Sequence, residues 1–256
     1  TSGPWKSSAS MTPPPTHSLL AAAAALLAAS CGDGGTGPGA PVTVGDPVGP
    51  DHSGQYHLGP VDFAESEWHN ACAPYPSSIR TITGNMIAGV SNSVATPGSL
   101  CDACIEVTTA MGRTEVLRVV TYGESGSDGD LDVSPEAYAA LNLDEFPRSM
   151  TWHLVACDNA EPLYVQFQTE ASQWWTSLWV RNPTMAIERV EVINARFPDG
   201  QELVLATDGT YTESSGFGEG GITLRVTGVT GAFIDIPLDG FEPGAVVAAQ
   251  GNIPLE

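Results

Sequence analysis

The 256-residue sequence predicts a mainly β protein with two domains after an N-terminal leader. Three observations support this fold class. The chain is long enough for two ordinary domains and a leader. Short runs of β-branched and other apolar residues recur between turn-forming residues, as is typical of strands. Only one helix has clear start signals, at Pro135 to about Leu141.

The N-terminal segment has the pattern of an export signal. An apolar stretch from Leu19 ends in small residues, and Leu27–Cys31 is similar to a bacterial lipobox. We therefore expect residues 1–31 to be a leader and Cys31 to be the lipidated first residue of the mature protein. The protein would then be an outer-membrane or cell-surface lipoprotein. A plain secretory signal cleaved nearby, which would make the protein extracellular, is the alternative.

The next segment, residues 32–52, is rich in Gly, Pro, Asp and Thr and has almost no large apolar residues. Such a composition does not form a packed core. The sequence therefore predicts a disordered tether between the lipid anchor and the first domain.

The first domain is predicted to span residues 53–159. Ile105–Thr108 and Glu115–Val120 are apolar, β-branched runs, and the residues Ala110–Arg113 between them carry turn signals. This pattern predicts a β-hairpin. A further strand, Trp152–Cys157, is expected to close the domain.

The predicted helix begins directly after an acidic loop. Ser134 is a good N-cap, Pro135 fits the first helical position, and Glu136 is favourable in the first turn. The helix start would hold Asp132 in a fixed place at the edge of the domain. A fixed carboxylate of this kind is a candidate general acid.

The second domain is predicted to span residues 162–256, after a short linker near 159–162. This half of the chain contains strand patterns alone, separated by turns, and their spacing predicts a small β-sandwich. The expected strands are Leu163–Gln168, Ser177–Arg181, Ile187–Ile193, Glu202–Leu205, Ile222–Val226 and Phe233–Ile236.

The five cysteines indicate disulfides. Setting Cys31 aside leaves four, an even number in a chain expected to be exported. A Cys101–Cys104 bridge would close only a tiny loop, so two pairings remain open. A zinc site at this CxxC pair is the alternative, but no second close pair follows it. We expect no metal and no organic cofactor.

The charge balance limits the class of ligand. The net charge is −21, and a surface of this kind repels nucleic acid and anionic wall polymers. We therefore expect a neutral or cationic ligand, such as a neutral polysaccharide, and no nucleic-acid partner. Any membrane contact would be made only through the lipid anchor.

Four segments, taken in order, resemble bacterial expansins. They are Cys101–Val107, Gly129–Tyr138, Trp152–Cys157 and Ala171–Asn182. The resemblance covers about residues 53–245. It implies a six-stranded double-psi β-barrel related to glycoside hydrolase family 45, followed by an immunoglobulin-like sandwich classed as a family 63 carbohydrate-binding module.

The resemblance also implies a function. Expansins loosen plant cell walls without hydrolysis, by disturbing non-covalent contacts between cellulose and matrix glucans. We therefore expect a monomer that binds cellulose, xyloglucan or another β-glucan, with peptidoglycan as a further candidate. The disulfide pattern of the family would pair Cys72 with Cys101 and Cys104 with Cys157.

The resemblance places several residues in a groove of the first domain. Asp132 aligns with the aspartate on which expansin activity depends, and Asp130 and Tyr122 are expected beside it. The second acid that a hydrolase needs would fall at Thr121 or Tyr122, and neither is an acid. His57 takes the place of a groove threonine, which would make the groove sensitive to pH.

The resemblance assigns carbohydrate stacking to tryptophans of the second domain. Trp174 and Trp175 are adjacent, and neighbours on a regular strand point to opposite faces, so we predict an irregular backbone there. Trp179 shares the parity of Trp175 and would face the same side. The third aromatic of the family platform is missing, and Trp179 or Tyr211 is expected to replace it.

Two other functions stay open at this point. The barrel could be an enzyme, either an endoglucanase or a peptidoglycan lytic transglycosylase. The protein could also be a surface carbohydrate-binding or adhesion module in which Asp132 is dispensable. Because a second catalytic acid is missing from its expected place, we favour wall loosening without hydrolysis.

Overall fold

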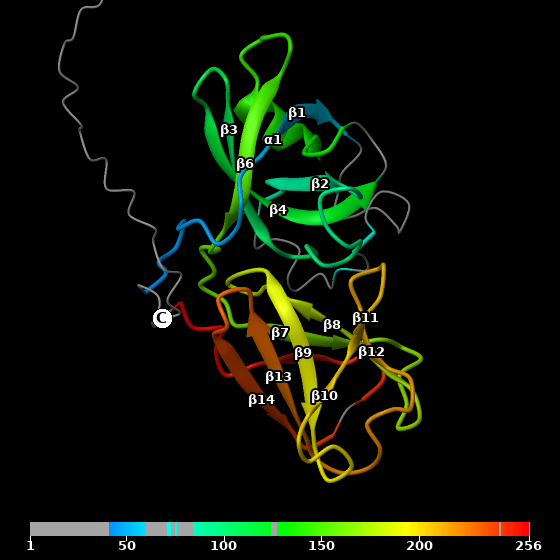
Figure 1. The fold of residues 1–256 in the computed structure, drawn as a ribbon. Helices are drawn as coiled ribbons and strands as arrows, with labels where there is room; N and C mark the ends of the chain where they lie inside the picture. The colour runs from blue at the N-terminus through cyan, green and yellow to red at the C-terminus, as the bar shows by residue number, and fades with distance from the viewer. Residues whose placement is uncertain are drawn as a thin grey trace, which may run out of the picture. The chain divides into compact units, whose positions relative to one another are not determined.

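The computed structural model describes residues 41–59, 71–72, 75, 84–123, 127–240 and 242–255. Figure 1 shows a β-barrel built by the first half of the described chain and two further sheets built by the second half. The mainly β fold class predicted from the sequence is confirmed. The leader, Cys31 and residues 32–40 of the tether lie outside the described residues.

The barrel is closed, with the strand order β1-β5-β2-β4-β3-β6. The pairs β1–β5 and β2–β4 are parallel, and the other neighbours are antiparallel. Its interior is filled by apolar side chains that include Tyr56, Leu117 and Trp152. The strands are β1 (His52–Leu58), β2 (Ile87–Ser91), β3 (Cys104–Thr109), β4 (Thr114–Gly123), β5 (Leu131–Val133) and β6 (Ser149–Val155).

The predicted hairpin is confirmed as β3 and β4, which pair with Ile105 opposite Leu117. Gly112 in the turn has φ +80°, a conformation that glycine adopts without a steric cost. Both strands are longer than the apolar runs in the sequence, because Cys104, Thr109, Thr114 and residues 121–123 also pair with neighbouring strands.

The predicted helix is confirmed as α1 (Pro135–Leu141), the one α-helix in the part of the chain that the structure describes. The Ser134 hydroxyl accepts a hydrogen bond from the N–H of Ala137. Ala137 and Leu141 are buried and join the barrel core. The described chain has no helix that is long and apolar enough to cross a membrane.

Part of the predicted tether is attached to the barrel. The N–H of Gly45 donates to the carbonyl of Ala156 over 2.9 Å, and the N–H of Ala156 donates to the carbonyl of Asp46 over 3.2 Å. The prediction of a disordered tether over 32–52 is therefore wrong for residues 41–52, the last of which is the first residue of β1. The composition of this segment did not predict the pairing, because the hydrogen bonds are formed by backbone groups and not by side chains.

The second half of the chain forms two antiparallel sheets, with the orders β10-β9-β13-β14 and β11-β12-β8-β7-β15. The barrel's last strand ends at Val155, and β7 begins at Tyr164. The strands are β7 (Tyr164–Phe167), β8 (Thr176–Arg181), β9 (Ile187–Ile193), β10 (Gln201–Glu202), β11 (Val204–Leu205), β12 (Tyr211–Glu213), β13 (Ile222–Gly228), β14 (Phe233–Leu238) and β15 (Val246–Ala248).

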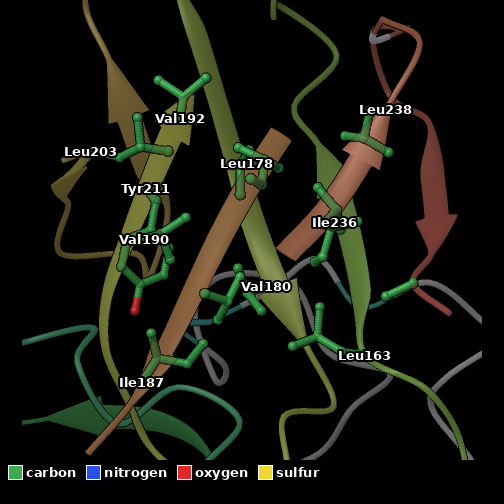
Figure 2. Packing of buried hydrophobic residues seen from close by; sticks show 14 of the residues in the cluster. Leu163, Leu178, Val180, Ile187, Val190, Val192, Leu203, Tyr211, Ile236 and Leu238 are labelled. Atoms are coloured by element: carbon green, nitrogen blue, oxygen red, sulfur yellow. The ribbon is translucent and has the colours of Figure 1, made fainter. Parts of the chain in front are cut away.

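Apolar side chains from both sheets meet in one cluster, which fits a β-sandwich. Figure 2 shows Leu178 and Val180 of β8 among side chains from the facing sheet, including Val190, Val192 and Ile236. Adjacent strand residues point to opposite faces. The even-numbered residues of β8 therefore supply the core, and the odd-numbered ones lie on the outer face.

Two disulfides join distant parts of the first half of the chain. They are Cys72–Cys101 and Cys104–Cys157, the pairs that the resemblance to expansins implies. Because both sulfur atoms of the CxxC pair are in disulfides, Cys101 and Cys104 cannot act as zinc ligands through thiolates. The zinc alternative is thereby excluded for this pair.

Candidate functional site

Asp132 is the middle residue of strand β5, between β1 and β2. Its neighbours Leu131 and Val133 are buried in the barrel core, so the side chain of Asp132 points to the outer face. The sequence placed Asp132 in a loop held by the helix start. The structure corrects this, because strand pairing on both sides of β5 holds the residue in place.

The residues beside Asp132 on this face are small or polar. His57 on β1 and Gly89 on β2 are its register partners, and Thr121 on β4 is the partner of Gly89. A Cβ atom at Gly89 would lie 2.7 Å from Thr121 Cγ2, so a larger residue here would require the Thr121 side chain to move. We call the set His57, Gly89, Thr121 and Asp132 the Asp132 face.

Asp130 ties the acidic loop to β1. Its Oδ1 accepts from the N–H of Gln55 over 2.8 Å, and its Oδ2 accepts from the N–H of Ser127 over 2.9 Å. Burial alone would raise the pKa of Asp130, but these bonds and the nearby His57 outweigh it and lower the pKa. The residue is only 7% exposed. Asp130 thus has a structural role in holding the loop, and its predicted contact with a polysaccharide stays a prediction.

His57 lies at the rim of the same region. Its side chain is 44% exposed, and Nε2 is 3.5 Å from Asp130 Oδ2. The structure therefore brings His57 and Asp132 together on neighbouring strands, where the sequence had only suggested it. A histidine beside carboxylates can donate to a sugar hydroxyl through either ring nitrogen.

Tyr122 belongs to a different surface. The register of β4 shifts by one residue beside Gly89, so Val120 has no partner on β2 and Thr121 pairs with Gly89. Tyr122 packs against the barrel core, and its side chain forms a hydrogen bond with Thr207 of the second half. Burial, with a smaller contribution from Asp208, raises its pKa. Thr121, and not Tyr122, is therefore the residue of β4 that faces Gly89 and Asp132, and a polysaccharide contact of Tyr122 stays a prediction.

The two adjacent tryptophans lie in a tight turn before β8. Ser172 and Trp175 exchange two backbone hydrogen bonds, of 2.7 and 3.2 Å, and form an isolated bridge. The predicted irregular backbone is thereby confirmed. Trp174, at the tip of this turn, is 70% exposed, whereas Trp175 is partly buried. We call Ser172–Trp175 the tryptophan turn.

A second segment supports this turn from behind. The N–H of Gly218 donates to the carbonyl of Gln173 over 3.0 Å, and the hydroxyl of Thr176 donates to the carbonyl of Ser172 over 2.8 Å. Gly216 has φ +70°, and a Cβ atom there would lie 2.2 Å from the carbonyl oxygen of Gln173. Trp174 is thus an exposed aromatic side chain on a braced backbone. This support could not be predicted from the sequence, because Gly216 and Gly218 lie more than 40 residues after the turn.

The other two predicted stacking residues are buried. Trp179 is 6% exposed, and its Nε1–H donates to the carbonyl of Asp208 over 3.0 Å. It lies on the outer face of its sheet, as strand parity predicts, but the turn at 206–210 covers it. Tyr211 is 5% exposed and packs in the sandwich core (Figure 2). The prediction that either one stacks on a sugar is wrong.

The fold resembles two solved structures of a bacterial expansin. The apo expansin of Clavibacter michiganensis aligns with a TM-score of 0.65 at 20% sequence identity, covering 79% of this chain and 96% of that one. A point mutant of the same expansin, in complex with cellohexaose, aligns with the same scores. No protein-family model and no curated protein matches the sequence. The barrel and sandwich of this chain therefore have the fold of a bacterial expansin.

Proposed function

We propose that this protein binds cellulose or a related β-glucan through the Asp132 face and the tryptophan turn. We also propose that it loosens wall polysaccharides without hydrolysing them. The observation that carries the proposal is Trp174, which is 70% exposed on a braced turn. The expansin complex of the same fold contains cellohexaose, an oligomer of β-linked glucose, and this supports the same ligand class.

An exposed indole ring suits a neutral polysaccharide. A pyranose ring presents a flat face of C–H groups, and an aromatic ring that is already fixed loses little conformational entropy when it packs against that face. The interaction needs no charge on the protein. It therefore does not conflict with a net charge of −21, which would repel pectin and other anionic polymers.

The carboxylates at and beside the Asp132 face, Asp132 and Asp130, support binding rather than hydrolysis. An inverting glycosidase needs two carboxylates roughly 6.5 to 9.5 Å apart, one as acid and one as base. Asp132 points to the outer face, but both oxygens of Asp130 accept backbone hydrogen bonds. Thr121, near the expected second acid, accepts a hydrogen bond from the N–H of Ala71. Of these three residues, Asp132 is therefore the one that would accept hydrogen bonds from sugar hydroxyls.

A pull-down against cellulose, xylan, pectin and peptidoglycan, at low and at moderate salt, tests the ligand class. We expect retention on cellulose or xylan, little dependence on salt because stacking is uncharged, and no retention on pectin. If none of the four polymers retained the protein, the proposal would be refuted.

A second experiment separates loosening from catalysis and from simple adhesion. Wall creep is measured with the native protein and with Asp132→Ala, at protein concentrations that give equal binding, while reducing sugars and muropeptides are assayed. We expect creep with the native protein, none with the variant, and no released fragments. Release of fragments would establish an enzyme, and equal creep with both proteins would establish that Asp132 is dispensable.

The site of action is also part of the proposal. We infer that the protein is exported and held at the cell surface by a lipid on Cys31, as a monomer that reaches its polymer from the tether. Metabolic labelling with a radioactive fatty acid would test this. Native protein should carry the label and Cys31→Ser should not, whereas an unlabelled native protein would point to plain secretion.

A further inference from the structure

Three charged side chains are buried where the barrel meets the sandwich. Asp102 comes from the turn before β3, Arg118 from β4 and Arg181 from the end of β8. Their side chains are 2%, 4% and 0% exposed. Arg181 Nη1 lies 2.9 Å from Asp102 Oδ2, and Arg118 Nη1 lies 3.8 Å from Asp102 Oδ1. We call these residues the buried triad.

Each arginine of the triad reaches the other half of the molecule. Arg181, on the sandwich, donates to Asp102 and to the carbonyl of Cys72, at 2.9 and 2.7 Å, and both acceptors belong to the first half. Arg118, on the barrel, donates over 3.1 Å to the side-chain oxygen of Asn182, which directly follows β8. The contacts are therefore reciprocal.

Neutral partners complete the surroundings of Arg181. Its guanidinium lies 4.1 Å from the ring centre of Tyr75 and 5.1 Å from that of Trp179. Its Nε donates to Gln166 over 3.0 Å. Cation–π contacts of this kind are strongest where water is excluded. The guanidinium is thus enclosed by partners from both halves of the chain.

A buried triad of this kind selects an orientation more than it adds stability. Removing charges from water is costly, and their mutual attraction repays this cost only when the geometry is good. Any other docking of the sandwich on the barrel would leave at least one buried charge without its partner. The arrangement in which all the contacts form is therefore favoured over its alternatives.

A second contact fixes the same junction. Gly98 of the barrel and Gly209 of the sandwich have φ +90° and +75°. A Cβ atom at Gly98 would lie 2.4 Å from the carbonyl oxygen of Ala206, and one at Gly209 would lie 2.6 Å from Cys101 Sγ. The two backbones approach more closely than side chains would allow. The junction is thus specified by charge pairing and by backbone fit.

We propose that Arg181 is a positioning residue, which holds the Asp132 face and the tryptophan turn in one fixed relation so that both engage the same polymer. This inference rests on the proposed function. Two surfaces held in a fixed relation gain avidity on a long polymer, because binding at the first raises the effective concentration of the second. A short oligosaccharide that occupies one surface gains nothing. Arg181 should therefore matter for cellulose and not for cellohexaose.

The test compares Arg181→Met with Arg225→Met in the full chain. Arg181→Met removes the charge, and Arg118 still leaves Asp102 with a cation. Arg225 is a matched control, because it pairs with Asp235 at 2.8 and 2.9 Å and lies 4.4 Å from the ring centre of Phe233, but on the surface.

Orientation is measured by spin labels on cysteines introduced at two exposed positions, Met111→Cys in the barrel and Val204→Cys in the sandwich. We expect the distance distribution between the labels to broaden about twofold in Arg181→Met and not in Arg225→Met. An unchanged distribution in Arg181→Met would overturn the proposal. This readout needs no ligand, so it stands even if the native protein binds no polysaccharide.

Binding is measured on the same samples with insoluble cellulose and with cellohexaose. For Arg181→Met we expect about tenfold weaker retention on cellulose and a change below about twofold for cellohexaose. Equal losses for both ligands, or no loss on cellulose, would refute the positioning role. If Arg181→Met does not fold, Arg181→Lys serves instead, since it keeps the charge but loses the fork of donors, and the same outcomes apply.

Discussion

The two candidate binding surfaces expose their side chains in different ways. Asp132 lies on a regular strand, where alternation places Leu131 and Val133 in the core and the carboxylate outside. Trp174 is exposed because the chain leaves the strand and turns, whereas Trp179 stays on β8 and is covered. A polar side chain can be presented by a strand alone. A large aromatic side chain stays open to solvent only where no neighbouring segment packs over it.

The largest effect is expected from Gly216→Ala, which tests whether the tryptophan turn depends on its support. Gly216 has φ +70°, and the added Cβ atom would lie 2.2 Å from the carbonyl oxygen of Gln173. The substitution should therefore destabilise the protein by about 2 to 3 kcal/mol and shift the turn. Thermal unfolding and cellulose pull-down should both change. Gly220→Ala is the control, because Gly220 has φ +96° with nothing within 4 Å. Equal effects of the two variants would contradict the role of the contact.

Trp174→Ala should have the next largest effect, on binding and not on stability. Loss of the exposed ring should weaken cellulose retention about tenfold, or about 1.4 kcal/mol, with an unchanged melting temperature. Phe146→Ala is a matched control, since Phe146 is an exposed aromatic residue of the barrel, 86% accessible. A similar loss in both variants would mean that any exposed aromatic contributes, and that the turn has no special role.

Asp132→Asn separates the contribution of the Asp132 face from that of the tryptophan turn. Because the amide keeps one acceptor oxygen and loses the charge, we expect cellulose binding to weaken only about twofold, as for one neutral hydrogen bond in place of a charged one. Wall creep should fall much further. Asp128→Asn, an exposed acid of the neighbouring loop, should leave both unchanged. Full creep activity in Asp132→Asn would show that the sandwich acts alone.

The smallest effect concerns Asp130 and pH. Its pKa is lowered in the folded protein, so its contribution to stability is present above the unfolded value of about 3.9 and is lost as the pH falls through the folded value. Asp130→Asn should therefore lower the melting temperature at pH 6, and the difference from native protein should shrink toward pH 2. A difference in melting temperature that stays constant from pH 6 to pH 2 would contradict a stabilising role of the ionised Asp130 carboxylate.

Local patterns in the sequence were sufficient for several elements. The cap at Ser134 and the proline after it specify the start of α1, because both act through neighbouring backbone groups. The turn between β3 and β4 follows from residues next to each other in the chain. The adjacency of Trp174 and Trp175, together with the stacking role that the resemblance assigns to both, predicted the break in strand geometry. In each case, the deciding contacts lie within a few residues.

Other features depend on contacts between distant residues, so only the tertiary structure decided them. Trp179 has the strand parity of an outward residue, but Asp208 accepts its hydrogen bond from a turn far along the chain, and the ring is buried. No local pattern around Asp130 predicted that its carboxylate would accept a hydrogen bond from the backbone N–H of Gln55. Asp102 and Arg181 are 79 residues apart, and their pairing depends on how the sandwich docks on the barrel. Sequence spacing specifies local geometry, whereas the burial of a side chain depends on which distant segment packs over it.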